Sequence, residues 1–165
     1  MIDYEALAAP FEFEDLEWRV LSVRKSGDKY QSMITPYVTN RAIQDRLDKV
    51  CGPPNWENIY LKWDQGQLCG ITIEDGERKV TKWDGAENTD IEPLKGGLSN
   101  SMKRAAVQWG IGRYLYYLPP MKGQQISWKP GAIRGDYYEK KTKEREVLWW
   151  TPNAAAVKAI KEASK

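Results

Sequence analysis

Histidine is absent from this chain of 165 residues, and cysteine occurs only twice. Without histidine the chain lacks the commonest general base and every Ser-His or Cys-His nucleophile pair, so it fits few classes of enzyme. Cys51 and Cys69 lie far apart in sequence and have no histidine beside them, so a zinc cluster of ordinary composition cannot form. We expect two small buried thiols in a reducing compartment, no metal site and no cofactor.

Long apolar runs are also missing. The first residues, Met-Ile-Asp-Tyr-Glu, lack the cationic and apolar regions of a secretion signal, and no stretch is long enough to cross a bilayer. We therefore expect a cytoplasmic protein without a membrane partner. The length fits a single domain over residues 1–165. We divide it into an N-terminal arm (1–15), a core (16–120) and a basic-aromatic hairpin with a C-terminal helix (121–165).

Two weaker patterns were weighed against chemistry. Acidic residues near predicted turns, with Lys82 close by, suggest a magnesium-dependent nuclease, but acidic residues in turns are more often only turn formers. The residues are Asp75, Glu77, Asp84 and Glu87. Gly110-Ile111-Gly112 lacks the remaining glycine of a dinucleotide fingerprint and follows a helix, which is the wrong context for phosphate binding. We predict a protein that is not an enzyme.

The chain is rich in tryptophan and tyrosine, and its charge is unevenly distributed. Eight Trp and nine Tyr stand against two Phe, a preference for rings with a polar edge, which suit interfaces and base stacking as well as half-buried sheet positions. Net charge is only +2, yet residues 1–94 carry 11 Lys and Arg against 18 Asp and Glu, and residues 95–165 carry 14 against 5. This asymmetry is compatible with polyanion binding and with head-to-tail association of subunits.

Residue patterns predict an α+β fold with antiparallel strands. Trp18–Arg24 and Tyr30–Tyr37 form a hairpin, and a helix from Arg41 to about Val50, capped by Thr39 or Asn40, buries Ile43, Leu47 and Val50. Three short strands follow as a meander, and a further hairpin and a capped Ala-rich helix end the chain. The meander strands are 56–63, 68–74 and 78–84, the second hairpin turns near 141–144, and the last helix covers 152–165 after Thr151 or Asn153.

The segment from Leu98 to Pro119 predicts a long helix that packs across the sheet and is stopped by Pro119-Pro120. Its apolar residues recur at helical spacing, so one face is buried while Lys103 and Arg104 lie at or beyond the edge of that face. The apolar positions are Leu98, Met102, Ala105, Trp109 and Tyr116. Such a helix can present cations to a polyanion, although most surface lysines and arginines simply face water.

Four segments together resemble the Rad-fifty-two (Rad52) superfamily of single-strand annealing proteins, and most closely its phage Sak-type members. They are Tyr37-Val-Thr-Asn-Arg41, Gly52-Pro-Pro-Asn-Trp56, Trp83-Asp-Gly85 and the whole of 97–119 with its Lys103-Arg104 pair. The resemblance covers about residues 16–120. It implies an antiparallel sheet crossed by a long helix, assembled into a ring-shaped or helical homo-oligomer.

The resemblance also implies a function: binding of single-stranded DNA by its phosphates and annealing of complementary strands in recombination and double-strand break repair. By position in the matching motifs, the DNA contacts fall on Arg41, Lys103 and Arg104, with Arg113, Lys62 and Lys95 as possible additions. A further helix cation of eukaryotic members is replaced by Val107, and a turn lysine of their second DNA path by Gln67. A single-strand-binding protein or a phage exonuclease is a possible partner.

Two other classes remain open. One is a module that binds and protects 3′ ends of single-stranded DNA without annealing. The other is a structural assembly protein whose charge asymmetry stacks subunits without any affinity for DNA.

Overall fold

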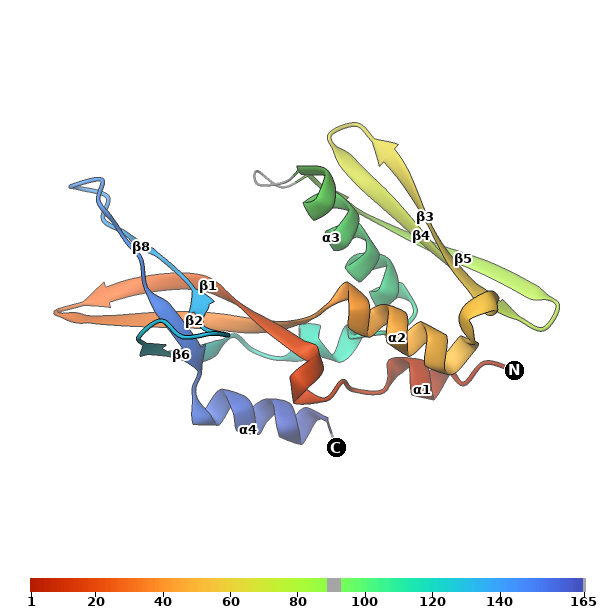
Figure 1. Cartoon of the computed structure of the whole chain (residues 1–165), viewed down its shortest axis with the longest axis horizontal. Helices are drawn as coiled ribbons and strands as arrows, with labels where there is room; N and C mark the ends of the chain where they lie inside the picture. The colour runs from red at the N-terminus through yellow and green to blue at the C-terminus, as the bar shows by residue number, and fades with distance from the viewer. Residues whose placement is uncertain (89–92, 165) are drawn as a thin grey trace. The chain divides into compact units, whose positions relative to one another are not determined.

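The computed structural model describes residues 1–88 and 93–164. Its contacts separate the chain into two compact units. Unit 1 comprises residues 1–11 and 38–114, and unit 2 comprises residues 12–37 and 115–165. Both units combine helices with antiparallel strands, which confirms the predicted α+β class (Figure 1).

Unit 1 is built on the predicted meander. β3 (Trp56–Trp63), β4 (Gly66–Asp75) and β5 (Arg78–Glu87) pair antiparallel in the order β3-β4-β5. Helix α3 (Pro93–Gln108) packs across one face of this sheet, mainly against β4 and β5 (Figure 1). Ile71 and Ile73 of β4 are buried with Met102 and Ala105 of α3, so the sheet and the helix share one core.

Helix α3 is displaced along the chain from the predicted segment, and both of its predicted ends were wrong. It begins at Pro93 and includes Gly97, where a side chain would collide with Gln67 and Asn88, so the glycine permits close approach to β4. It ends at Gln108, because Gly110 and Gly112 adopt φ values of +91° and +71°, which interrupt a helix. Tyr116 therefore lies in the short 3₁₀ helix η3 (Arg113–Tyr117) and is 66% exposed, not buried on the apolar stripe.

The predicted helix after Thr39 is α2 (Asn40–Cys51), and the Thr39 side chain accepts a hydrogen bond from the Ala42 amide as its N-cap. Ile43 and Leu47 are buried as predicted, but Cys51 is buried where Val50 was expected, since Val50 is only half-buried. α2 is followed by the 3₁₀ turn η2 (Pro53–Asn55) and contacts α1 (Tyr4–Ala8) and α3.

Arg46 of α2 ties down the N-terminal segment. Its guanidinium donates to the carbonyls of Ala6, Leu7, Ala9 and Pro10 at 2.6–3.2 Å and lies 4.1 Å from the centre of the Phe11 ring. The N-terminal arm thus ends in a specific contact instead of an open tail.

Unit 2 contains the predicted hairpin, β1 (Leu16–Ser26) and β2 (Lys29–Val38), after the 3₁₀ turn η1 (Phe13–Asp15). The hairpin belongs to a five-stranded sheet of order β1-β2-β6-β10-β7, separate from the meander. The added strands are β6 (Met121–Ile126), β7 (Ile133–Arg134) and β10 (Trp149–Pro152). Trp150 of β10 is almost fully buried, and its indole donates to the Gly135 carbonyl at 3.0 Å.

The predicted second hairpin is present as β8 (Tyr137–Tyr138) paired with β9 (Arg145–Glu146), with its turn at 139–144. The last helix is α4 (Ala154–Ala163), and Asn153 is its N-cap, accepting from the Ala156 amide at 2.8 Å. None of the helices described is long and apolar enough to cross a membrane.

Candidate nucleic-acid interface

The two adjacent cations of α3 lie outside the core of unit 1. Lys103 is half-buried, and the side chain of Arg104 is 53% exposed. Consecutive helical residues point about 100° apart around the axis, so the pair covers a wide sector of the helix surface. The buried positions of α3 are Gly97, Ser101, Met102, Ala105 and Ala106, which leaves both cations beyond the sheet contact, as predicted.

Arg104 is held in place by β5. Its Nε donates to Asp84 Oδ1 at 2.9 Å, and Gln108, one turn further along α3, donates to Asp84 Oδ2 at 3.2 Å. Partial burial raises the pKa of the Asp84 carboxyl, but hydrogen bonds from the Gly85 amide, Arg104 and Gln108 outweigh that effect and leave the pKa below its ordinary value. The carboxylate is therefore ionised at neutral pH and fixes one side of the guanidinium.

Two more cations gather at the C-terminal end of α3. Lys82 of β5 donates to the Gln108 carbonyl at 3.0 Å, with its ammonium 4.3 Å from the centre of the Trp109 ring. Arg113 donates to the carbonyls of Val107 and Gln108 at 2.7–3.0 Å. Helix carbonyls at a C-terminus lack intrahelical partners, and cations there are favourable, so both side chains cap α3.

Lys82 is a cation that the analysis of the sequence did not place at this site. The alternation of β5 could have indicated it, because Lys82 and Asp84 are two residues apart and so share the face that α3 covers. The pairing confirms this arrangement, since Lys82 lies opposite Ile71, and Asp84 lies opposite Cys69, both buried beneath α3.

Arg41 lies in the first turn of α2 and is exposed. A cation at the N-terminal end of a helix is unfavourable by about 0.3–1 kcal/mol, because the unpaired amides there carry partial positive charge. The same amides attract anions, so Arg41 and the start of α2 favour the same kind of ligand. Because α2 contacts α3, the three predicted DNA contacts come from two helices that touch.

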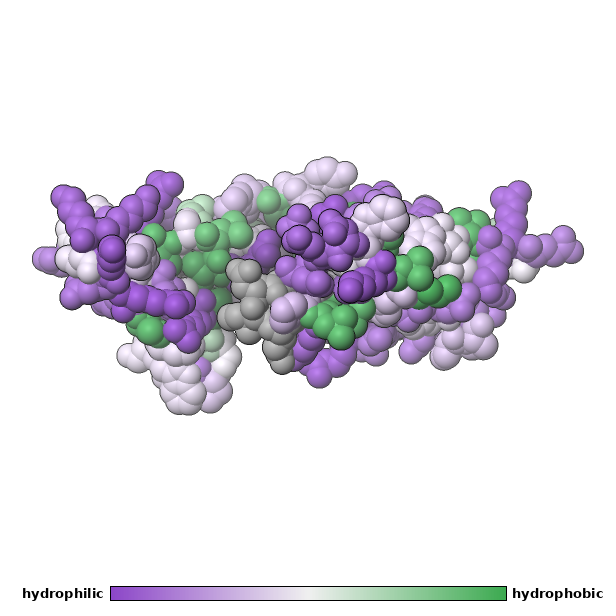
Figure 2. Space-filling model, turned by 90° about the horizontal axis from the view of Figure 1, so that it is seen from above, coloured by the Kyte–Doolittle hydropathy of each residue, from purple (hydrophilic) through white to green (hydrophobic). Residues whose placement is uncertain are grey.

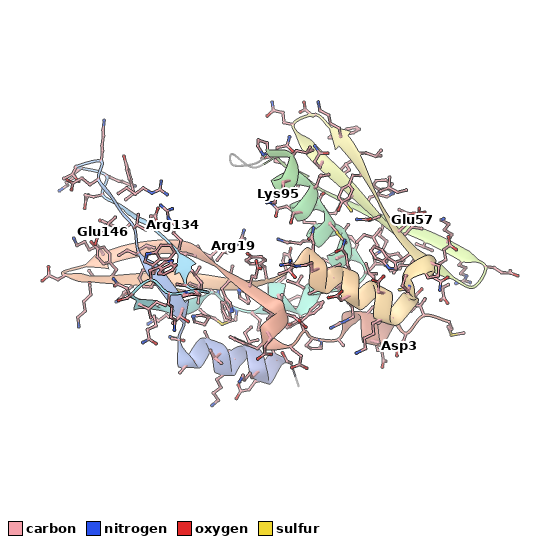
Figure 3. All side chains as sticks on the ribbon, in the orientation of Figure 1. Asp3, Arg19, Glu57, Lys95, Arg134 and Glu146 are labelled. Atoms are coloured by element: carbon pink, nitrogen blue, oxygen red, sulfur yellow. The ribbon has the colours of Figure 1, made fainter. Side chains whose placement is uncertain are left out.

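The other two possible contacts lie at a distance from this group. Lys95 is exposed in the first turn of α3, about 14 Å along the helix axis from Arg104 at 1.5 Å per residue (Figure 3). Lys62 is exposed on the edge strand β3 and pairs in register with Gln67. Gln67 itself is buried and donates to Asn88 at 3.5 Å, so it faces the core of unit 1.

The acidic residues considered for a nuclease serve other contacts. Asp84 pairs with Arg104, while Asp75 accepts from the Ile2 amide at 2.8 Å and lies 3.6 Å from the N-terminal ammonium. Within residues 1–88 and 93–164, no three His, Cys, Asp or Glu side chains are grouped as metal ligands would be. Both cysteines are buried free thiols, as predicted, and burial raises the pKa of Cys69 to about 11.

The geometry defines a class of site. Exposed cations on two contacting helices, held by hydrogen bonds and by a buried carboxylate, form a surface that attracts phosphates by charge and hydrogen bonding. They line a surface of helices, with no deep pocket between them for a small substrate. A polyanionic chain is the ligand that such a surface fits.

Comparison with known sequences agrees with this class. Residues 4–131 match the family described as Rad52/22 family double-strand break repair protein, and the chain belongs to that family. Two curated relatives are the single-stranded DNA-binding protein DdrA of Deinococcus deserti, 35% identical over 132 residues, and DdrA of Deinococcus radiodurans, 35% identical over 123 residues.

These matches cover 74% and 68% of this chain but 59% and 54% of the relatives, so the chain spans little more than half of their length. No solved structure matches. The family assignment made from the four sequence segments is confirmed.

Proposed function

We propose that this protein binds single-stranded DNA through Arg41, Lys103 and Arg104 and brings complementary strands together during recombination and repair. The observation that carries the proposal is the Lys103-Arg104 pair on the outer side of α3, with Arg104 oriented by Asp84 at 2.9 Å. The family and the printed names of the two DdrA relatives support the same ligand.

The proposed mechanism requires no bond chemistry. Neutralising phosphates lets two strands approach, and holding a strand by its backbone leaves the base edges available for pairing. Stacking on Trp or Tyr could add about 1–3 kcal/mol per base but would compete with pairing, so phosphate contacts are the main source of affinity. The protein then acts without catalysis, and several copies in a homo-oligomer hold one strand by avidity.

The test is the double substitution Lys103→Ala with Arg104→Ala. Binding of a labelled single-stranded oligonucleotide, followed by fluorescence anisotropy, should fall at least tenfold while the circular dichroism spectrum is unchanged. Lys158→Ala with Lys161→Ala, which removes two exposed cations of α4, is the matched control and should change affinity less than threefold. Equal affinity of the wild type and the α3 variant would contradict the proposed site.

Salt dependence and strand pairing complete the test. Three phosphate contacts per subunit predict a slope of log K against log salt of about −2 for each subunit engaged, at about −0.7 per contact on single strands. Accelerated pairing of two complementary oligonucleotides separates annealing from protection of 3′ ends, which would leave pairing unaccelerated and depend on a free 3′ end.

A further inference from the structure

The outer face of the meander, defined as the side chains of β3, β4 and β5 that point away from α3, has no partner among the described residues and is largely apolar. Asn58 and Ile71 point toward α3, since Asn58 donates to Met102 Sδ at 3.6 Å and pairs in register with Ile71. Residues one position along each strand therefore point outward. The apolar ones are Ile59, Leu61, Trp63, Leu68 and Trp83.

This face is exposed and flat. Leu61 is 50% and Trp63 69% exposed, although large apolar groups of this kind are rarely left together in water. Two glycines flatten it: a side chain at Gly70 would meet the Trp83 ring at 2.7 Å, and one at Gly85 would meet Leu68 at 2.7 Å. Figure 2 shows green apolar side chains reaching the surface among purple polar ones.

The same face is hollowed at one end. A depression of about 450 Å³ lies beside Trp63 and Leu68, where Gly66 and Gly85 leave no side chains to fill it. That volume is within the range of sites that take a small ligand or a few inserted side chains. The flat apolar area and the depression together have the form of a protein-docking surface, with a recess for an anchoring residue.

Charge argues against DNA as the occupant. The cation of this face, Lys79, is already bound by Glu57 at 3.0 Å and Glu74 at 2.8 Å. Asp64 and Glu87 lie beside the depression. A strand of phosphates would meet more carboxylates than cations along this sheet, whereas a partner with an apolar centre and a basic rim would match it. Glu57 is labelled in Figure 3 on β3.

The chain itself contains a segment of the required chemistry. Residues 121–150 carry seven Lys and Arg against four Asp and Glu, and they expose Trp128 (65%) and Tyr138 (55%). An acidic, apolar face and a basic, aromatic segment on one chain are complementary between copies. Such a heterologous contact leaves one of each surface open on every dimer, so it continues into a ring or a filament.

We infer that the outer face of the meander binds residues 121–150 of a second copy of this chain, and that this contact builds the assembly on which the proposed avidity for DNA rests. The interface is separate from Arg41, Lys103 and Arg104. Assembly and DNA contact can therefore be removed one at a time.

Leu61→Lys is the test, because it places a charge at the centre of the outer face at an exposed position. Sedimentation velocity should show the wild type as an assembly and this variant as a 19.0 kDa monomer with an unchanged circular dichroism spectrum. Leu94→Lys, at an exposed leucine of α3, is the matched control and should remain assembled. A monomeric wild type, or a Leu61→Lys variant of wild-type mass, would overturn the inference.

A mixing experiment tests the direction of the contact. Trp128→Ser, which weakens the second surface, should also be monomeric alone. Mixed with Leu61→Lys, each variant supplies the surface that the other lacks, so the mixture should form a dimer and nothing larger. A mixture that stays monomeric would overturn the head-to-tail arrangement.

The DNA readout separates this inference from the proposed function. Leu61→Lys should keep its affinity for a short oligonucleotide within threefold, whereas the Lys103→Ala with Arg104→Ala variant should lose that affinity and remain assembled. If Leu61→Lys keeps its mass but loses oligonucleotide binding, the outer face is a base-stacking surface and the inference is wrong.

Discussion

Asp84 stands in an unusual position for a carboxylate, next to a cation assigned to bind phosphate. It accepts from Arg104 and Gln108 and is only 20% exposed, so it both orients Arg104 and cancels part of its charge. A phosphate that approaches Arg104 meets a guanidinium already fixed in direction, which lowers the entropy cost of binding, but it also meets the repulsion of Asp84. These two effects can be separated by substitution.

Asp84→Asn retains an acceptor for Arg104 Nε and removes the charge. We expect it to bind single-stranded DNA about two to five times more tightly at low salt, an advantage that disappears as salt screens the repulsion. Asp84→Ala, which removes the acceptor too, should bind less tightly than Asp84→Asn. Anisotropy titrations at two salt concentrations measure both, and weaker binding by Asp84→Asn at low salt would show that the charge is not opposed to the ligand.

The lowered pKa of Asp84 also sets the sign of a pH effect on stability. A carboxyl whose pKa is depressed in the folded state stabilises the fold above its unfolded pKa, near 3.9, and this contribution is lost as pH falls through the folded value. The difference in unfolding free energy between the wild type and Asp84→Asn should be present at pH 7 and shrink toward pH 3, as measured by urea denaturation.

At the scale of elements, α3 depends on its C-terminal end as much as on its contact with the sheet. Gln108 is its last residue, and the carbonyls of Val107 and Gln108 are bonded by Arg113 and Lys82. The exposed pair Lys103 and Arg104 lies within the last two turns. Fraying of this end would therefore move the proposed DNA contacts.

Arg113→Ala should remove three hydrogen bonds from this end and lower the unfolding free energy by about 1 kcal/mol, the range for cations at a helix C-terminus. If Arg113 acts mainly as a cap, its affinity for single-stranded DNA at 10 °C should fall less than that of Lys103→Ala. Thermal unfolding and anisotropy report the two effects. A large loss of affinity at unchanged stability would instead make Arg113 a direct contact.

Elements with strong local signals could be predicted, and those that depend on distant pairing could not. The meander, α2 and α4 follow from alternation, turn residues and N-caps that act over a few residues. The end of α3 was missed because its apolar spacing continues past Gln108, while positive φ at Gly110 and Gly112 breaks the helix. The order β2-β6-β10 joins strands more than 80 residues apart, which no local pattern encodes.

The candidate site divides in the same way. Arg41, Lys103 and Arg104 were assigned through the resemblance, and an apolar stripe placed the last two outside the core. Their partners could not be read from the chain, because Asp84 precedes Arg104 by 20 residues and reaches it only through packing of α3 on β5. The role of Arg113 as a cap likewise required the true end of the helix.

At the scale of the whole molecule, one subunit offers few phosphate contacts, so strand binding depends on how many subunits act together. With three contacts in each subunit, the free energies of successive subunits on one strand combine, less the cost of spanning them. Affinity should therefore rise steeply with oligonucleotide length in the wild type and level off once one subunit's contacts are filled in a monomeric variant.

Measured by anisotropy with oligonucleotides from about 6 to 60 nucleotides, the salt slope should steepen with length in the wild type, by about −2 for each further subunit engaged. In Leu61→Lys it should stay near the single-subunit value at every length, because each bound monomer responds to salt independently. Strand pairing should fall in the same variant, since two strands are then no longer held by one assembly. A steep length dependence in a monomeric variant would mean that neighbouring subunits associate on the DNA itself.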